Sequence, residues 1–177
     1  MEAAILSVTI PYLSGHPLKP GQIWRFAGLD PTCEWQPGKK RPWNARLKTL
    51  AWHIGESFVK TRNHPKDFYG KLYVQRKRRE WERNLSGEFA DQAKAALSKK
   101  DFRDDKKARK YYAGYFRLPD RPIEELVDLA MNDIGRFEEL LVDVGEGNGL
   151  PMLPPGHIHS RAKRYAVKLF LSHFHEV

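Results

Sequence analysis

The chain has 177 residues and carries 31 Lys and Arg against 22 Asp and Glu, so its formal net charge is +9 and its pI is about 9.7. No apolar run approaches the roughly 20 residues that cross a bilayer, which excludes an integral membrane protein. Glu2 and the lack of a basic N-terminal segment argue against a secretory signal, and the single cysteine, Cys33, excludes an intramolecular disulfide. We expect one soluble domain in a reducing compartment, with a polyanionic partner.

The positive charge is concentrated in the middle of the chain. Residues 39–110 hold 22 basic and 9 acidic side chains, whereas residues 111–150 hold 3 basic and 9 acidic ones. A basic block of this kind indicates contact with the phosphates of a nucleic acid. The alternative is a set of solvated, lysine-rich helix faces.

Residues 1–42 are rich in proline and glycine, which is typical of turns and short elements. Within this lead-in we predict a strand over residues 4–10, a short helix over residues 21–29 that Gly28 ends, and a loop over residues 30–41.

Residues 43–113 predict a basic helical region. Its first helix covers residues 43–60, where Pro42 marks the start. The apolar residues of this helix follow a 3.6-residue period and are Trp43, Leu47, Leu50, Ile54 and Phe58. A second helix over residues 65–84 has Phe68, Leu72 and Tyr73 facing inward. Its charged half, residues 75–83, projects into solvent or onto a partner.

The remaining segments also predict helices. Ser86 is the expected N-cap of a helix over residues 87–99, and a solvated helix follows over residues 99–110. Residues 121–144 form a long helix with an acidic outer face, and a basic terminal helix covers residues 157–176. The expected fold class is mainly α, a single multi-helix domain.

A glycine turn followed by basic residues precedes the first long helix. Gly38, Lys39, Lys40 and Arg41 lead into Trp43 and Asn44, and the free N–H groups of a helix start add to such side-chain charge. This arrangement predicts a phosphate site, with a plain basic loop as the alternative. Asn44 either caps the helix or contacts a base edge.

The tryptophans offer stacking surfaces for bases. Trp43 and Trp52 are nine residues apart, which places them on opposite sides of one helix. We therefore expect one of them to face the core and the other to face a neighbouring element or a ligand. Packing between helices is the alternative for each tryptophan.

Metal and nuclease chemistry find little support in the sequence. The pairs His157/His159 and His173/His175 are two residues apart, a spacing that does not share a helix face, and no CxxC or HExxH motif occurs. The acidic side chains of residues 101–105 are interleaved with basic ones, and those of residues 120–146 resemble a surface helix face. His157 and His159 are instead expected to contact phosphates near Arg161 and Arg164.

Two segments carry a family resemblance. Ala27-Gly28-Leu29-Asp30-Pro31 and Gly38-Lys39 resemble the AGLDP…GGK stretch in the C-terminal domain of transposases of the insertion-sequence 110/116/902 group. Residues 155–174 resemble the terminal helix of that family, and the N-terminal segment resembles part of its helix-hairpin-helix region. The resemblance covers residues 20–75 and 155–175.

The resemblance implies a DNA recombinase that is guided by a structured RNA. In that family a serine of this domain acts beside an acidic nuclease domain that binds a divalent metal. Two departures matter here. The few residues before the motif leave no room for the nuclease domain within this chain, and residues 32–37 contain no serine. Thr32 is the one hydroxyl there and Cys33 the one thiol, and an active recombinase would need one of them as its nucleophile. Of the two, Thr32 is the catalytic candidate.

We therefore expect a DNA-binding protein of transposition or recombination, located in the prokaryotic cytoplasm with the nucleoid, that is not catalytically self-sufficient and has no cofactor in this chain. Alternatives are a structured-RNA binder, a recombinase completed by a separate nuclease chain, and a protein adaptor that docks through residues 121–144. The partners considered besides DNA are a structured guide RNA, that nuclease chain and a second copy of this chain. The expected nucleic-acid-binding residues are Lys39, Lys40, Arg41, Trp43, Asn44, Arg46, Lys48, Arg76, Lys77, Arg78, Arg79, His157, Arg161 and Arg164.

Overall fold

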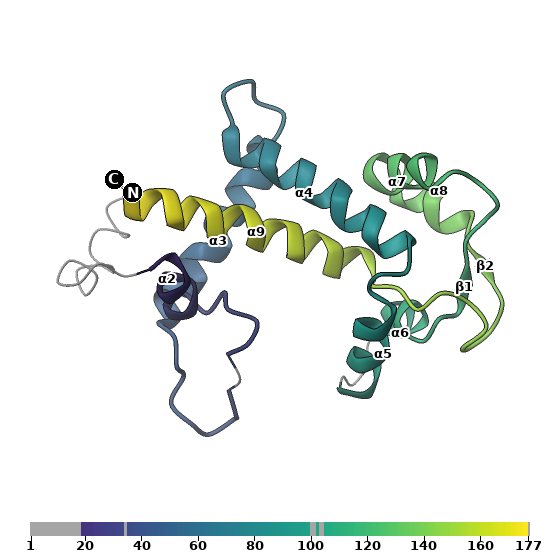
Figure 1. Cartoon of the computed structure of the whole chain (residues 1–177), viewed down its shortest axis with the longest axis horizontal. Coiled ribbons are helices and arrows are strands. Elements are labelled where there is room, and N and C mark those ends of the chain that lie inside the picture. Colours follow the sequence, from purple (N-terminus) through teal and green to yellow (C-terminus); the bar gives the residue numbers. More distant parts are fainter. Residues whose placement is uncertain (1–18, 34, 100–101, 103–104, 177) are drawn as a thin grey trace. The chain divides into compact units, whose positions relative to one another are not determined.

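The computed structural model describes residues 19–33, 35–99, 102 and 105–176. Within these ranges it has eight helices and two short strands, which confirms the mainly α fold class (Figure 1). None of these helices is both long enough and apolar enough to cross a membrane. The strand expected over residues 4–10 lies outside the described residues.

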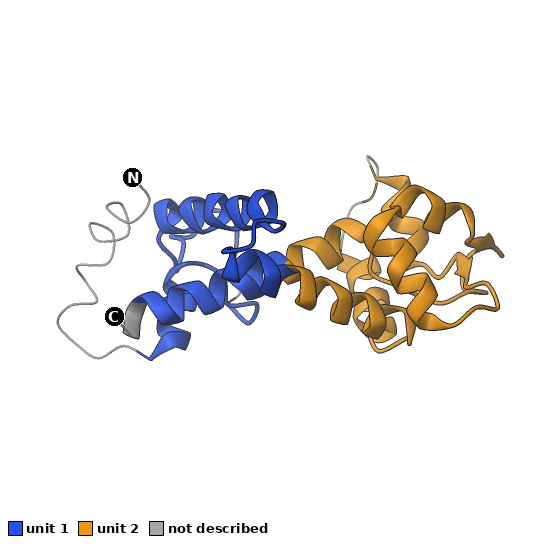
Figure 2. Ribbon diagram, turned by 90° about the horizontal axis from the view of Figure 1, so that it is seen from above, with its two compact units in different colours: residues 1–73, 163–177 blue, residues 74–162 orange. Residues whose placement is uncertain are grey.

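Contacts divide the chain into two compact units (Figure 2). Unit 1 comprises residues 1–73 and 163–177, and unit 2 comprises residues 74–162. Helices α4 (Phe68–Leu85) and α9 (Pro155–Glu176) contribute residues to both units. The single-domain organisation stays a prediction.

Unit 1 is built on α2 (Pro20–Phe26), α3 (Ala45–Thr61) and parts of α4 and α9. The predicted apolar period of α3 is confirmed at Leu47, Leu50 and Ile54, which are buried. They pack with residues of α2 and α9, so the hydrophobic core of this unit joins distant parts of the sequence. The buried members of this core are Ile23, Ala27, Leu29, Leu47, Leu50, Ala51, Ile54, Val167 and Leu171.

Unit 2 contains the remaining elements in chain order. They are α5 (Ala90–Lys99), α6 (Lys106–Tyr112), β1 (Phe116–Arg117), α7 (Ile123–Asn132), α8 (Ile134–Glu139) and β2 (Val142–Asp143). The two strands pair antiparallel, with Phe116 opposite Asp143. Trp81 is fully buried at the centre of the core, where its ring meets Phe137 edge-on with centroids 5.3 Å apart.

The helix predicted over residues 121–144 is wrong in its length. The structure breaks it at Asp133, which has non-helical backbone angles and separates α7 from α8. The Asp133 carboxylate accepts a hydrogen bond of 3.0 Å from the backbone N–H of Arg136, so this residue caps α8. Aspartate favours such caps because its side chain competes with the helix for backbone donors. The end of the segment, which was predicted to be helical, forms strand β2.

Helix α4 differs from its prediction in which side chains it buries and which it exposes. Phe68, expected inward, is 57% exposed, whereas Glu80 and Trp81 of the supposedly solvated half are fully buried. The burial could not be read from the sequence, because it depends on ion pairs in which Arg76 and Arg161 neutralise the charge of Glu80. Ser86 does not begin α5 either. Its hydroxyl donates to the carbonyl of Arg83 at the end of α4.

Helices α9 and α6 follow the predictions more closely. The basic terminal helix is confirmed as α9, with Ala162 and Ala166 fully buried. The helix expected within residues 99–110 is α6, which begins after its cap Asp105. Its final residues Tyr111 and Tyr112 are buried, so this helix is anchored in the core of unit 2 and not merely solvated.

Candidate nucleic-acid interface

The turn after α2 forms the base of the candidate site. The short helix is confirmed, and Gly28 follows it with a φ of +65°, a left-handed conformation that favours glycine. A Cβ atom at Gly28 would lie 3.0 Å from Trp43 Cγ and 3.0 Å from Lys48 Cδ. The absence of a side chain at Gly28 therefore lets Trp43 and Lys48 pack against this turn.

Asp30 and Thr32 continue the same turn. The Asp30 carboxylate accepts hydrogen bonds from the Thr32 hydroxyl (2.7 Å) and the Thr32 backbone N–H (2.9 Å). These two bonds stabilise the ionised carboxylate and lower the pKa of Asp30. A carboxylate with a lowered pKa is a weaker base, so the pair resembles a local turn more than an activated nucleophile. Cys33, half-buried and free, follows it.

Asn44 caps the long helix of unit 1. Its side-chain oxygen accepts a hydrogen bond of 3.0 Å from the N–H of Leu47, and α3 begins at Ala45. The backbone N–H of Asn44 donates to the Phe26 carbonyl (2.9 Å), which ties the start of α3 to the end of α2. Of the two roles considered for Asn44, the structure supports capping.

An open pocket of about 620 Å³ lies over the first turns of α3. The wheel argument for Trp43 and Trp52 is wrong, because Trp43 precedes α3 and both side chains line this same pocket. Trp35 joins them from the loop, with its ring 6.2 Å from that of Trp43 and inclined by 60°. The lining residues are Trp35, Arg41, Trp43, Ala45, Lys48, Thr49 and Trp52.

A cation lies over each of the three rings. Arg41 is 5.7 Å from the centroid of Trp35, and Lys48 is 4.1 Å from that of Trp43. Lys163, from α9, is 5.0 Å from the centroid of Trp52. Cations within about 6 Å of an aromatic centroid are attracted by the ring quadrupole. These contacts hold the tryptophan side chains in place around the pocket.

Lys163 is a site residue that the sequence patterns did not predict. The ammonium group of this nearly buried side chain pairs with Glu56, and its stem crosses Gly55. A Cβ atom at Gly55 would lie 2.6 Å from Lys163 Cγ, so only glycine admits the lysine at this distance. A glycine on the apolar face of α3 is the one signal in the sequence that another chain segment packs closely there.

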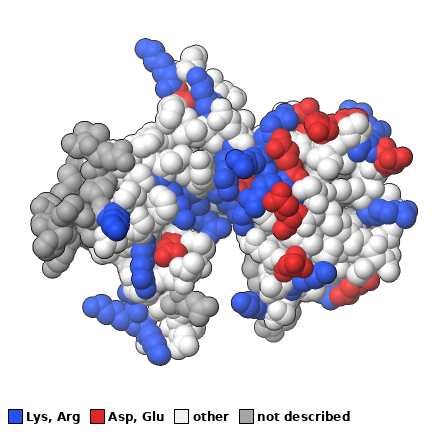
Figure 3. Space-filling model, in the orientation of Figure 1, with Lys and Arg blue, Asp and Glu red and all other residues white. Residues whose placement is uncertain are grey.

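The loop before α3 and the first turns of α3 carry unbalanced positive charge. Residues 35–55 contain five basic residues and no Asp or Glu. All five side chains are exposed, and none has a carboxylate partner within ion-pair distance among the described residues. Figure 3 shows basic side chains projecting from the loop that leads to α3. We call this group the basic face; it consists of Lys39, Lys40, Arg41, Arg46 and Lys48.

The predicted binding residues of unit 2 are placed differently. Arg76 and Arg161 both pair with the buried carboxylate of Glu80, and Arg78 pairs with Asp128. His157 shares a hydrogen bond of 3.0 Å between Nδ1 and the hydroxyl of Tyr112. The fourteen predicted residues divide between the two units. Unit 1 holds Lys39, Lys40, Arg41, Trp43, Asn44, Arg46, Lys48 and Arg164, and unit 2 holds Arg76, Lys77, Arg78, Arg79, His157 and Arg161.

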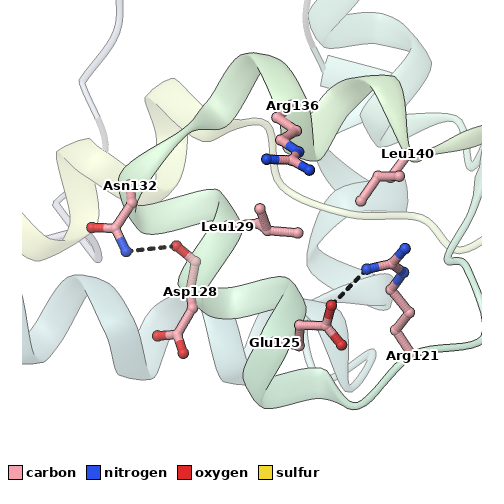
Figure 4. Close-up of a pocket in the computed structure, with 7 residues that line it drawn as sticks. All are labelled: Arg121, Glu125, Asp128, Leu129, Asn132, Arg136 and Leu140. Atoms are coloured by element: carbon pink, nitrogen blue, oxygen red, sulfur yellow. Dashed lines mark hydrogen bonds and ion pairs between the residues drawn. The ribbon is translucent and has the colours of Figure 1, made fainter.

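Unit 2 has its own pocket, of about 360 Å³, between α7 and α8 (Figure 4). Acidic and basic side chains both line it, and Arg121 pairs with Glu125 at 2.6 Å. This balance gives the pocket no preference for a polyanion. The candidate nucleic-acid interface is therefore the basic face with the tryptophan pocket of unit 1.

Neither metal-ligand geometry nor similarity to other proteins gives further evidence on the function of this site. Within the ranges that the structure describes, no group of three or more His, Cys, Asp or Glu side chains could hold a metal ion. No protein-family model, curated protein or solved structure matches the chain. The resemblance to the transposase domain therefore stays a prediction.

Proposed function

We propose that this chain binds DNA through the basic face of unit 1. The observation that carries the proposal is the contrast in charge pairing between the basic face and three other predicted binding residues, Arg76, Arg78 and Arg161. The five cations of the basic face have no carboxylate partner among the described residues, whereas Arg76, Arg78 and Arg161 of unit 2 are held in ion pairs. A cation without a partner can contact a phosphate without first losing an ion pair, and it releases a counterion from the DNA when it does so.

We further propose that this binding serves DNA transposition or recombination. Support comes from the residues of the transposase resemblance, which lie around the basic face. Gly28 packs beneath Trp43, and Gly38 precedes Lys39 with a φ of +85°. The proposal does not extend to strand cleavage by this chain alone, because the Thr32 hydroxyl is engaged by a carboxylate of lowered pKa.

A salt titration tests the proposal. The purified chain is titrated onto labelled duplex DNA, onto a folded RNA hairpin and onto a DNA hairpin of the same sequence between 50 and 200 mM salt. The triple variant Lys39→Ala/Lys40→Ala/Arg46→Ala removes three charges and leaves the cations over the tryptophan rings in place. For duplex DNA, the slope of log affinity against log salt should become shallower by roughly one unit for each phosphate that the variant no longer neutralises.

The matched control removes three exposed lysines of unit 2, Lys94→Ala/Lys99→Ala/Lys106→Ala. Equal losses of affinity in both triple variants would show that affinity follows net charge alone and would overturn the proposed face. Affinity that hardly changes with salt would overturn phosphate binding itself. Tighter binding to the RNA hairpin than to a DNA hairpin of the same sequence, which has the same unpaired loop, would move the proposal from DNA to structured RNA.

A further inference from the structure

We infer that the pocket between Trp35, Trp43 and Trp52 holds an unpaired base, while the basic face holds the phosphates of the same strand. This inference rests on the proposed function and adds a preference, for single-stranded or looped nucleic acid over a continuous duplex. It follows from the placement of the tryptophans, from the way their rings are held and from the charge of the pocket.

The three pocket tryptophans are not needed by either hydrophobic core. The other two tryptophans of the chain are core residues. Trp81 is fully buried, and Trp24 packs against the core of unit 1 with its Nε1 donating to the Lys168 carbonyl at 3.0 Å. By contrast, Trp52 is 55% exposed and Trp35 is 37% exposed. Large aromatic surface left in water around one pocket marks a binding site and not a packing element.

The rings of the pocket are fixed before any ligand arrives. Trp35 donates from Nε1 to the Lys39 carbonyl at 2.7 Å, and Trp43 rests against the Gly28 turn. The Trp52 ring meets His53 edge-on at 5.1 Å, and Lys163 lies over it. Side chains that are already ordered lose little conformational entropy on binding. Less of the free energy of contact with a flat ligand is therefore offset, and the affinity is higher.

The charge of the pocket identifies the kind of flat ligand. Aromatic cages that bind quaternary ammonium groups leave their rings open to a cation. Here cations already contact all three rings, and no carboxylate of the described residues lines the pocket. The arrangement disfavours a cationic ligand and favours one that joins an aromatic face to negative charge. A nucleotide has both features.

The state of the base follows from stacking. In a duplex both faces of a base are covered by its neighbours, so a protein ring can stack only on a base that has left the stack. Thr49 is the uncharged polar side chain of the pocket, and its hydroxyl donates to the Ala45 carbonyl at 3.1 Å. Because Arg41 and Lys48 lie over tryptophan rings and Thr49 is engaged within its own helix, we expect binding that depends little on sequence.

The test compares one sequence in three forms: single-stranded DNA, the same strand in a duplex, and single-stranded RNA. Trp52→Ala should weaken binding to single-stranded DNA about 5- to 150-fold, the range for loss of one stacked base, and should leave duplex affinity unchanged. Trp52→Phe should recover part of the loss. Phe68→Ala removes an exposed aromatic of unit 1 outside the pocket and should change neither affinity.

The outcomes separate this inference from the function on which it rests. One outcome is that duplex binding depends steeply on salt while Trp52→Ala binds single-stranded DNA as tightly as the wild-type chain. This outcome would overturn the inference about the pocket and would leave the proposal for the basic face intact. Absence of binding to every probe would overturn the proposed function and this inference with it. Equal loss for single-stranded RNA and DNA would support the pocket and identify unpaired bases of either source as its ligand. Circular dichroism of each variant checks that the fold is kept.

Discussion

Arg161 donates a hydrogen bond from Nε to the carboxylate of Glu80, a side chain with no exposed surface. The other carboxylate oxygen is 2.5 Å from the guanidinium of Arg76, and Arg83 lies 3.9 Å away. Arg161 also lies over the Phe89 ring, with its guanidinium carbon 4.4 Å from the centroid. Glu80 therefore links α9 to α4 within unit 2. Its arginine partners are engaged in this ion-pair network and are not free to contact a phosphate.

Removal of the Glu80 carboxylate should destabilise unit 2. Glu80→Ala leaves three guanidiniums facing one another without their shared anion, so we expect a loss of about 3 kcal/mol in the free energy of unfolding. The measurement is urea denaturation followed by circular dichroism. Arg78→Ala breaks the more exposed pair with Asp128 and should cost less than about 1 kcal/mol. A cost for Glu80→Ala as small as that of Arg78→Ala would show that the buried network contributes nothing.

Arg161→Ala distinguishes a structural role from DNA contact. Since its guanidinium is occupied by Glu80 and by Gln92, 3.0 Å away, its loss should lower thermal stability and leave the salt slope of DNA binding unchanged. The comparison is with the Lys39→Ala/Lys40→Ala/Arg46→Ala variant, which should show the opposite pattern. A shallower salt slope in Arg161→Ala would return this residue to the interface.

The sequence predicts the helical parts of this fold well where one helix packs by a regular apolar period. Leu47, Leu50 and Ile54 repeat at helical spacing, and α3 buries them as expected. The period fails at Asp133, where a local cap outweighs continuation of the apolar face. It also fails at Glu80, because the burial of a charge depends on Arg161, a partner 81 residues away.

Only the positive charge of the candidate site could be predicted from the sequence. The basic run of residues 39–48 is visible in the sequence, and the structure leaves it exposed. The convergence of Trp35, Trp43 and Trp52 depends on the path of the loop before α3, which no periodicity encodes. Lys163 reaches the site from the far end of the chain, so its contact with Trp52 could not be found from local spacing.

Two acidic residues near β2 should give unit 2 a pH-dependent stability. Lys110 and the Gly145 N–H hold the pKa of Asp143 below its usual value, and Arg109 and the Tyr115 hydroxyl do the same for the pKa of Glu146. Because folding favours their ionised forms, the stabilisation is present above the unfolded pKa values of about 4 and is lost as the pH falls through the lowered ones.

The corresponding measurement is the melting temperature of Asp143→Asn/Glu146→Gln from pH 7 to pH 2. The double variant should melt below the wild-type chain at pH 7, and the difference should shrink as the medium becomes acidic. Asp120→Asn/Glu139→Gln is the control, since these exposed acids have no ion-pair partner among the described residues. A difference that stays constant across the pH range would rule out these two carboxylates as its source.

The cap at Asn44 should be needed for the start of α3 and for the tryptophan beside it. Asn44→Ala removes the acceptor of the Leu47 N–H and should cost about 1 kcal/mol of stability, whereas Asn44→Ser keeps an acceptor and should cost less. Chemical denaturation of both variants gives the comparison. Equal costs would indicate that packing and not the cap sets the beginning of the helix.

Substitution at Gly28 should affect binding through Trp43. In Gly28→Ala the new methyl group meets Trp43 Cγ and Lys48 Cδ at 3.0 Å, and the backbone stays in a left-handed conformation that alanine resists by about 1–2 kcal/mol. We expect a lower melting temperature and, at temperatures where the variant is folded, weaker binding to single-stranded DNA because the Trp43 ring is displaced. Gly21→Ala is the matched control, since a methyl group there has nothing within 4 Å and lies in α2, where alanine is favoured. A folded Gly28→Ala variant with full single-strand affinity would show that the position of Trp43 does not matter for binding.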